Sequence, residues 1–219
     1  MTAVARQAST EGRATKSRGR ASTAKRALYR TLIVEAAERV FAKRGYAGAK
    51  MSDVAAESGL ALATVYATIT SKEELYAAIH EERGRALLER AREASEGARS
   101  AFDAIVRGVE TYVGFLAEHR DYLRVHLNEA QPWALDPKFI CSEQKRQWKQ
   151  GLELSTAVFA GAIAEGSVIA GDPGLHARLM IAAHQVFLVA WVEAGMKEPV
   201  SDLVARMQDH LRRTFAVAR

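Results

Sequence analysis

Apolar residues recur every three or four positions over most of the chain, which is the spacing of one face of an α-helix. From residue 24 the first such face comprises Leu28, Leu32, Ile33, Ala36, Ala37, Val40 and Phe41. We expect this helix to end at Gly45, because glycine suits a helix C-terminal cap. Two short apolar segments follow at 51–58 and 62–69, separated by Gly59. The pattern predicts three helices before residue 70.

The remainder of the chain continues the helical pattern. Ser71 and Glu74 have the spacing of a capping box, which predicts a long helix from Lys72 to about Ser95. Further apolar faces follow at 102–116, 122–129, 148–163, 174–194 and 200–217, with loop signals at 131–137 and 171–174. Since glycine and proline are sparse, an all-β fold is disfavoured. We predict an all-α fold of about nine helices.

The net charge of +5 is unevenly distributed. The first 30 residues hold eight basic side chains and one acidic side chain, a net charge of +7, and the rest of the chain carries −2. Residues 1–23 also have almost no bulky apolar side chains, so burial cannot offset the entropy of ordering them. We predict a flexible basic arm over residues 1–23.

Several classes of protein are disfavoured. No run without a charged residue exceeds the 14 residues from Leu179 to Val192, which is fewer than the roughly 20 that span a bilayer. The chain begins with no apolar stretch of signal-peptide length, and the single Cys141 forms no intrachain disulfide, which is typical of a reducing compartment. We expect a cytoplasmic protein without a membrane partner.

Enzyme and metal motifs are absent from the sequence. His80 and Glu81 begin like a zinc-binding helix, but Gly84 stands where the second histidine is required. His119 and His126 are seven residues apart, about 10 Å along a helix, which is too far to chelate one metal ion. There is no nucleophile elbow and no phosphate-binding loop. We predict no catalytic residues, no metal site and no cofactor.

The segments 51–58 and 62–69 have the pattern of a helix-turn-helix. This motif needs a small residue where the helices cross, a glycine in the turn and an apolar anchor on the second helix. Ala55, Gly59 and Val65 supply these three features at spacings of four and six residues. The pattern predicts a DNA-reading element.

A wider set of residues resembles the N-terminal module of the TetR family of transcriptional regulators. The matching positions are Ala36-Ala37, Phe41, Gly45-Tyr46, Asp53-Val54-Ala55, Gly59-Leu60, Thr64-Val65-Tyr66 and Lys72-Glu73-Glu74-Leu75. The resemblance implies a three-helix DNA-binding head, assigned to residues 24–72, and a helical ligand-binding and dimerisation body, assigned to residues 73–219. It also implies a homodimer that binds a palindromic DNA operator, more often as a repressor than as an activator, and responds to a small-molecule effector.

The resemblance also assigns DNA contacts. Tyr66 and Lys72 match phosphate contacts of the family, and the positions that match base-facing residues are Ser52, Leu62, Ala63, Thr64 and Thr68. We add Lys50 and, around the arm, Arg18, Arg20, Lys25 and Arg26. The chain departs from the family at Ala61, where a helix-capping serine or threonine is usual, and also at Ala49, Lys50 and Ile69.

The predicted recognition segment 61–68 contains no Arg, Lys, Asn or Gln, the residues that make bidentate contacts to bases. We therefore expect apolar contacts from Leu62, Ala63 and Ala67 and single hydrogen bonds from Thr64 and Thr68, with some specificity from DNA shape. The basic arm supplies a second DNA contact, in a minor groove, if it is more than a solubilising or non-specific tail.

The helix predicted over 175–192 is apolar almost all round, so we expect it to bury one side in its own core and another against a partner chain. The predicted dimer interface comprises Val186, Val189, Leu203, Met207 and Leu211; the alternative is a central core helix of a monomer. A mostly apolar pocket is predicted from Tyr112, Phe115, His126, Trp133, Phe139, Trp148, Phe159, Met180 and His184. Each of these residues taken singly also fits plain core.

These predictions combine into a DNA-binding regulator released by a small hydrophobic or aromatic effector. One alternative is a helical small-molecule-binding protein or enzyme that keeps only a vestigial DNA-binding head. Another is a regulator that binds DNA but no ligand.

Overall fold

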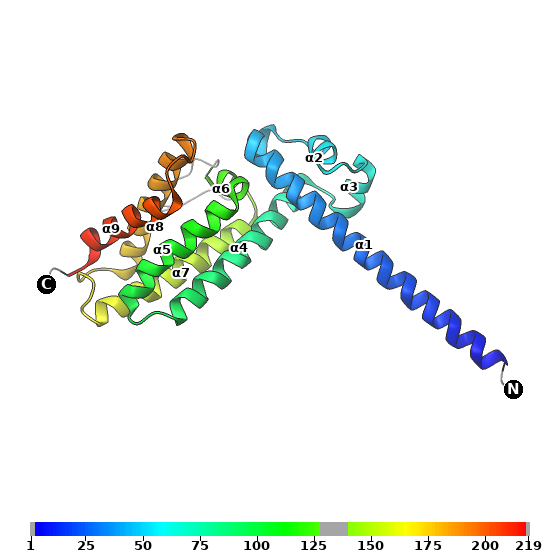
Figure 1. Cartoon of the computed structure of the whole chain (residues 1–219), viewed down its shortest axis with the longest axis horizontal. Helices are drawn as coiled ribbons and strands as arrows, with labels where there is room; N and C mark the ends of the chain where they lie inside the picture. The colour runs from blue at the N-terminus through cyan, green and yellow to red at the C-terminus, as the bar shows by residue number, and fades with distance from the viewer. Residues whose placement is uncertain (1–2, 128–139, 218–219) are drawn as a thin grey trace.

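The computed structural model describes residues 3–127 and 140–217, with side chains from residue 23 onward. Within these ranges the chain forms nine helices and no β-strand, which confirms the predicted all-α fold. The helices are α1 (Ala3–Gly48), α2 (Met51–Ser58), α3 (Leu62–Thr68), α4 (Lys72–Glu96), α5 (Ala101–Glu118), α6 (Arg120–Leu127), α7 (Ser142–Ala164), α8 (Pro173–Glu193) and α9 (Val200–Phe215). Figure 1 shows a small head of α1–α3 set beside an elongated bundle of α4–α9.

The head is held together by the apolar face of α1. Ile33, Phe41, Val54 and Val65 are buried where α2 and α3 pack on α1. Gly45 interrupts the helical backbone of α1 at φ 67° and ψ 171°, as its position in the sequence predicts, and one more turn leads to Gly48. The predicted segments 51–58 and 62–69 correspond to α2 and α3.

The N-terminal part of α1 differs from the flexible arm expected over residues 1–23. The structure continues the helix back to Ala3, and Figure 1 shows this part projecting away from the head. Residues 3–23 hold five alanines and four arginines, which favour helix; Gly12 and Gly19 disfavour it, but the chain has no proline before residue 132. A helix nucleated by the packed part of α1 therefore extends backward without meeting a proline.

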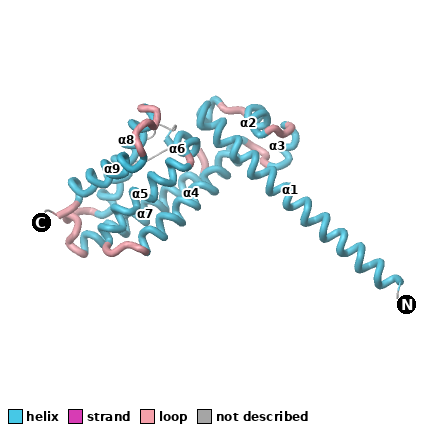
Figure 2. The backbone as a smooth tube through the Cα atoms, viewed as in Figure 1, coloured by secondary structure: helices cyan, strands magenta, loops and turns pink. Residues whose placement is uncertain are grey.

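The body is a bundle around α5, which packs against α4, α7 and α9 (Figure 2). α7 also packs against α4 and α8. The last helix, α9, buries Leu203, Met207, Leu211 and Phe215 along one stripe.

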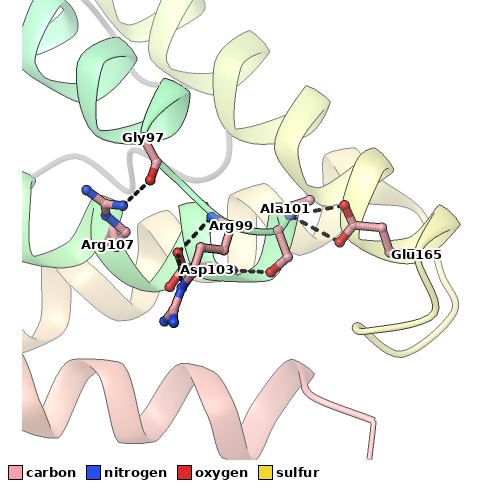
Figure 3. Close-up of polar contacts among 7 residues, drawn as sticks. Gly97, Arg99, Ala101, Asp103, Arg107 and Glu165 are labelled. Carbon is pink, nitrogen blue, oxygen red and sulfur yellow. Dashed lines mark hydrogen bonds and ion pairs between the residues drawn. The ribbon is translucent and has the colours of Figure 1, made fainter.

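The corner between α4 and α5 is fastened by polar contacts (Figure 3). The Arg107 guanidinium donates to the carbonyl of Gly97, and the backbone N–H of Arg99 donates to Asp103 (3.0 Å). That backbone hydrogen bond lowers the pKa of the Asp103 carboxyl. The Glu165 carboxylate, just after α7, accepts from the N–H of Ala101 at 3.1 and 3.2 Å. The corner thus ties three helices together at one end of the bundle.

The head and body meet where α1 packs against α4 and α6. Glu38 of α1 is buried there and accepts a hydrogen bond from Arg83 of α4 at 2.8 Å. Burial raises the pKa of Glu38, although the neighbouring Arg83 acts in the opposite direction. The junction therefore contains a charged pair at the point where the two parts of the chain touch.

α8 is the one helix in the described ranges with the length and apolar composition of a membrane span. However, Leu188 and Trp191 are buried inside the body, and the Trp191 indole donates to the carbonyl of Glu198 (3.0 Å). α8 is therefore a packed helix of the bundle.

Candidate DNA interface and ligand cavity

The turn between α2 and α3 has the geometry that a helix-turn-helix requires. Gly59 ends α2 in the left-handed region at φ 68°, where glycine is favoured because it lacks a Cβ. The N–H of Leu60 then donates to the carbonyl of Ala55 (3.2 Å). Ala55 and Val65 are buried, so the predicted small and apolar positions do hold the two helices together.

One face of α3 is left uncovered by the head. Leu62 and Tyr66 are 42% and 46% exposed, and Ala63 and Ala67 are exposed as well. Because Leu62 and Tyr66 are large side chains at the surface, this face offers an apolar contact surface to a partner.

The other predicted DNA contacts of α3 are less accessible. Thr64 and Thr68 are half-buried, and the Thr68 hydroxyl donates to the carbonyl of Thr64 at 2.9 Å. Thr68 therefore retains only its acceptor capacity for a base. Ala61 caps α3 without a side-chain hydrogen bond, which costs about 1 kcal/mol relative to serine or threonine.

Lys72 holds the head together from the start of α4. Its ammonium donates to the carbonyls of Tyr46 (2.8 Å) and Ala49 (3.2 Å) and lies 4.4 Å from the centre of the Tyr46 ring. An ammonium has three donors, so one remains for a phosphate. Ser52 and Lys50, the other predicted contacts near α2, are exposed.

The cap of α4 differs in part from the predicted capping box. The Ser71 hydroxyl accepts from the N–H of Glu74 at 3.0 Å, as expected. The Glu74 carboxylate, however, accepts from the hydroxyl and the N–H of Thr70 (2.7 and 2.8 Å), and the hydroxyl contact is the main cause of a lowered Glu74 pKa. The start of α4, which carries Lys72, is thereby fixed.

The basic residues of α1 that were predicted to contact DNA all precede the part of the helix that packs in the head. Lys25 and Arg26 are exposed, and the Lys25 ammonium lies 5.4 Å from the centre of the Tyr29 ring. Arg18 and Arg20 belong to the part of α1 that is described by its backbone alone.

The body contains a cavity of about 230 Å³ between α4, α5, α6, α7 and α8. Of the predicted pocket residues, the structure places Tyr112, His126, Trp148, Phe159, Met180 and His184 in its lining. Trp133 and Phe139 lie outside the described residues.

Phe115 does not line the cavity, and its prediction was wrong. It lies about one turn beyond Tyr112 on α5, where its ring contacts His119 (4.6 Å between ring centres) and Tyr122 (6.4 Å). The Tyr122 ring lines the cavity, whereas Phe115 does not. Because Phe115 is fully buried elsewhere, it belongs to the core near the junction.

Five rings follow one another along the cavity lining; we call them the ring row. They are His80, Tyr122, His126, Tyr112 and His184, with successive ring centres 5.8, 5.9, 6.4 and 5.8 Å apart. Within the row the Tyr112 hydroxyl and His126 Nε2 are hydrogen-bonded at 3.1 Å.

Sequence reasoning missed His80 and Tyr122. It set His80 aside because Gly84 could not complete a zinc motif, although His80 follows Tyr76 by one turn on the buried face of α4. That periodic position was the available signal. Gly84 is itself part of the lining, and the Gln147 amide occupies the space that a Cβ there would need.

The described lining of the cavity carries no ionised side chain. Burial lowers the pKa of His126 and His184 to about 4 and that of His80 to about 3, so all three rings are neutral at pH 7. No Asp, Glu, Lys or Arg occurs among the described residues of the lining. The described ranges also hold no group of three or more His, Cys, Asp or Glu suited to a metal ion.

The predicted dimer residues separate into two groups. Val186 of α8 is 69% exposed and Val189 is half-buried. Leu203, Met207 and Leu211 are completely buried inside the single chain, so their assignment to a dimer interface was wrong. The reason is that the one apolar stripe of α9 is already covered within the body, where α9 packs on α5.

Comparisons with known proteins agree with this geometry. Residues 33–79 match the sequence profile of the bacterial regulatory proteins of the TetR family. A comparison with curated proteins found no match.

Solved structures resemble the chain over most of its length. The fatty acid degradation regulator FadR of Bacillus halodurans and FadR of Bacillus subtilis, the latter in complex with stearoyl-CoA, each give a TM-score of 0.72 at 20% identity, covering 83% of this chain and 96% of theirs. The ketosteroid transcriptional regulator KstR2 of Mycobacterium tuberculosis gives a TM-score of 0.73 at 19% identity, covering 86% of this chain and 95% of its own. Residues 33–79 thus match the DNA-binding module of the TetR family of transcriptional regulators, and the chain as a whole shares the fold of these neighbours.

Proposed function

We propose that the protein is a repressor that binds a palindromic operator as a homodimer and leaves it when an apolar effector enters the body. The observation that carries the proposal is the pairing of an uncovered α3 face with a neutral cavity in the same chain. As a DNA-binding regulator it would act in the cytoplasm. In this proposal residues 24–72 act as the DNA-binding unit and residues 73–219 as the ligand-binding and dimerisation unit.

The proposed DNA surface is the exposed face of α3 with its neighbours at the head surface. Leu62, Ala63 and Ala67 are suited to apolar contacts such as thymine methyl groups, and Tyr66 and Lys72 to phosphates. Thr64 and Ser52 add single hydrogen bonds, whereas Thr68 is restricted to accepting one.

We propose that the basic part of α1 contacts the DNA backbone through Arg18, Arg20, Lys25 and Arg26. A minor-groove contact, which suits an extended arm, is disfavoured because a helix is about 10–12 Å wide and the groove about 6 Å. Phosphate contacts need no such insertion.

The proposed dimer contact is the outer face of α8. Leu175, Leu179 and Val186 are all exposed on this helix, which is unusual for large apolar side chains. A second copy of the chain would cover them, with the partly buried Val189 at the margin.

Two helices connect the cavity to the head. α4 begins at the head with Lys72 and lines the cavity with His80, and α6 lines it with Tyr122 and His126 while packing against α1. A ligand that shifts either helix would change the spacing of the two heads in a dimer, which must match the spacing of the operator half-sites.

The structural neighbours support an effector with a large apolar part. One FadR structure holds stearoyl-CoA, and KstR2 is named a ketosteroid regulator. For the present chain we propose a small hydrophobic or aromatic effector.

Selection of bound DNA from genomic fragments by the purified full chain tests the proposal. We expect enrichment of an inverted repeat. The variant Ala63→Asp places a negative charge on the exposed α3 face and should weaken binding to that repeat by at least about a hundredfold, since a carboxylate repels phosphates. Ala157→Asp, at an exposed position of α7, is the matched control and should bind normally.

Failure to enrich any sequence would overturn the proposal. It would favour the alternative of a helical small-molecule-binding protein whose head no longer reads DNA.

A further inference from the structure

We propose that the effector is an uncharged, mainly apolar molecule carrying one or two hydroxyl or carbonyl oxygens, which hydrogen-bond to His80 and His184. This inference rests on the proposed function in that it names the ligand of the same cavity.

The charge of the ligand follows from the absence of counter-charges. No ionised side chain is found in the described part of the lining, and the three histidines there are neutral. Moving an ionised carboxylate from water to such a site is strongly unfavourable unless a partner compensates its charge. The cavity therefore selects against the charged member of any pair of otherwise similar ligands.

The oxygens of the proposed ligand are inferred from two imidazole nitrogens in the cavity lining. The Nε2 atoms of His80 and His184 are buried and have no hydrogen-bond partner among the described residues. A buried polar atom without a partner destabilises the protein, and a ligand oxygen in the cavity would remove that penalty. His126 differs, because its Nε2 is already bonded to the Tyr112 hydroxyl.

The positions of these nitrogens also indicate how the ligand lies. His80 and His184 are the two ends of the ring row, with Tyr122, His126 and Tyr112 between them. A ligand that meets both ends lies along the row, with its remaining surface against apolar side chains such as Leu152 and Ile181.

The volume sets the scale of the ligand. A cavity of about 150 Å³ accommodates one benzene ring. At about 230 Å³ this cavity fits a molecule of two fused rings or a medium-length alkyl chain.

Isothermal titration of the full chain with matched probes tests the proposal. The probes are 2-naphthol against 2-naphthoate, and 1-decanol against decanoate, at pH 7.5. We expect the neutral member of at least one pair to bind at least about tenfold tighter than its carboxylate. Equal or tighter binding of the carboxylates, or no binding of either neutral probe, would overturn the proposal.

Histidine variants identify the polar contacts. His80→Phe and His184→Phe keep a ring of similar size but remove the nitrogens, so each should weaken binding of the preferred neutral probe by up to about tenfold. Binding of naphthalene or decane, which lack the oxygen, should be retained by both variants, and this separates a missing hydrogen bond from a damaged cavity. His210→Phe, at an exposed position of α9, is the control. If both cavity variants bind the neutral probe as the unmodified chain does, the assignment of the oxygens is wrong.

DNA binding by the same proteins separates this inference from the proposed function. Selective binding of the neutral probes by a chain that enriches no operator would support the ligand class and contradict the regulatory role. A chain that binds an operator but prefers the carboxylates would support the regulatory role and contradict the ligand class.

Discussion

Gly59 is the residue on which the geometry of the helix-turn-helix depends. Its φ of 68° is open to a non-glycine residue only at a cost of about 1–2 kcal/mol, although a Cβ there would meet no atom within 4 Å. We expect Gly59→Ala to lower the free energy of unfolding by about that amount in urea titrations. Gly114→Ala, within α5 and likewise free of contacts, is the control and should be neutral or slightly stabilising. Equal effects in the two variants would exclude backbone strain as the cause.

Gly84 makes room for a polar side chain of the cavity. An added Cβ would displace the Gln147 amide, which is the far end of a flexible side chain. We expect Gly84→Ala to change the free energy of unfolding by less than about 1 kcal/mol, because the higher helix propensity of alanine offsets the displacement. Because Gln147 already lines the cavity, its displaced amide should fill part of it and weaken binding of 2-naphthol, measured by titration. Unchanged affinity would contradict this role of Gly84.

The candidate site was predictable residue by residue only where a local pattern carried it. Ala55, Gly59 and Val65 follow from spacing, since a turn and a helix crossing are local constraints. The hydrogen bond that occupies the Thr68 hydroxyl is also local, but it depends on a rotamer that composition does not specify. His80 contacts Tyr122 of α6, through which the ring row continues to α5 and α8, and such a contact has no signature within α4 alone.

At the scale of elements, the contact between α1 and α4 contains a testable electrostatic pair. The raised pKa of Glu38 means that the folded state retains its proton above pH 4.5, where the unfolded chain begins to lose it. The contribution of Glu38 to stability is therefore greatest below pH 4.5 and falls as the pH rises toward the folded pKa. We expect Glu38→Gln to remove this fall and to be at least as stable as the unmodified chain at pH 7.

Thermal unfolding at several pH values measures this effect as the difference in stability between the Glu38→Gln variant and the unmodified chain. The contributions of the other carboxyl groups cancel in this difference. Arg83→Met removes the partner and leaves Glu38 buried alone, which should cost about 3 kcal/mol at pH 7. A Glu38→Gln difference that does not vary with pH would show that Glu38 is not the titrating group.

Apart from the N-terminal extension of α1, helix positions were predictable to within about six residues, because each helix has an apolar face, a cap or a glycine stop. What each face packs against was not predictable. The stripe of α9 was assigned to a partner chain, yet it is buried within the body. For α8 one side was expected in the core and another against a partner, and Leu188 and Trp191 are buried while Val186 is exposed. Periodicity shows that a face is apolar but does not identify the surface that covers it.

At the scale of the whole molecule, the proposed dimer depends on the outer face of α8. Val186→Arg would place a charge in an apolar contact, so we expect a monomer at micromolar concentration by analytical ultracentrifugation. The monomer should remain folded, because Val186 is 69% exposed in the single chain. Ala157→Arg on α7 is the control. If the Val186→Arg variant still sediments with the mass of a dimer, the interface lies elsewhere.

The N-terminal extension of α1 gives a second prediction for the assembled protein on DNA. Deleting residues 1–22 should make the plot of log affinity against log salt shallower by about one unit for each phosphate that the extension neutralises. Replacing Lys16, Arg18 and Arg20 by alanine preserves helix propensity and should reproduce most of the change. An unchanged slope would eliminate the extension as a DNA contact.

The burial of α9 also bears on the order in which the protein forms during synthesis. The head core of Ile33, Phe41, Val54 and Val65 is complete when the ribosome has made the first third of the chain. α5, by contrast, stays partly uncovered until residues 200–215 emerge, because α9 packs against it and Gln208 donates to the carbonyl of Val106 (3.0 Å). The head can therefore fold well before the body, whose bundle is closed over α5 only when translation is almost finished.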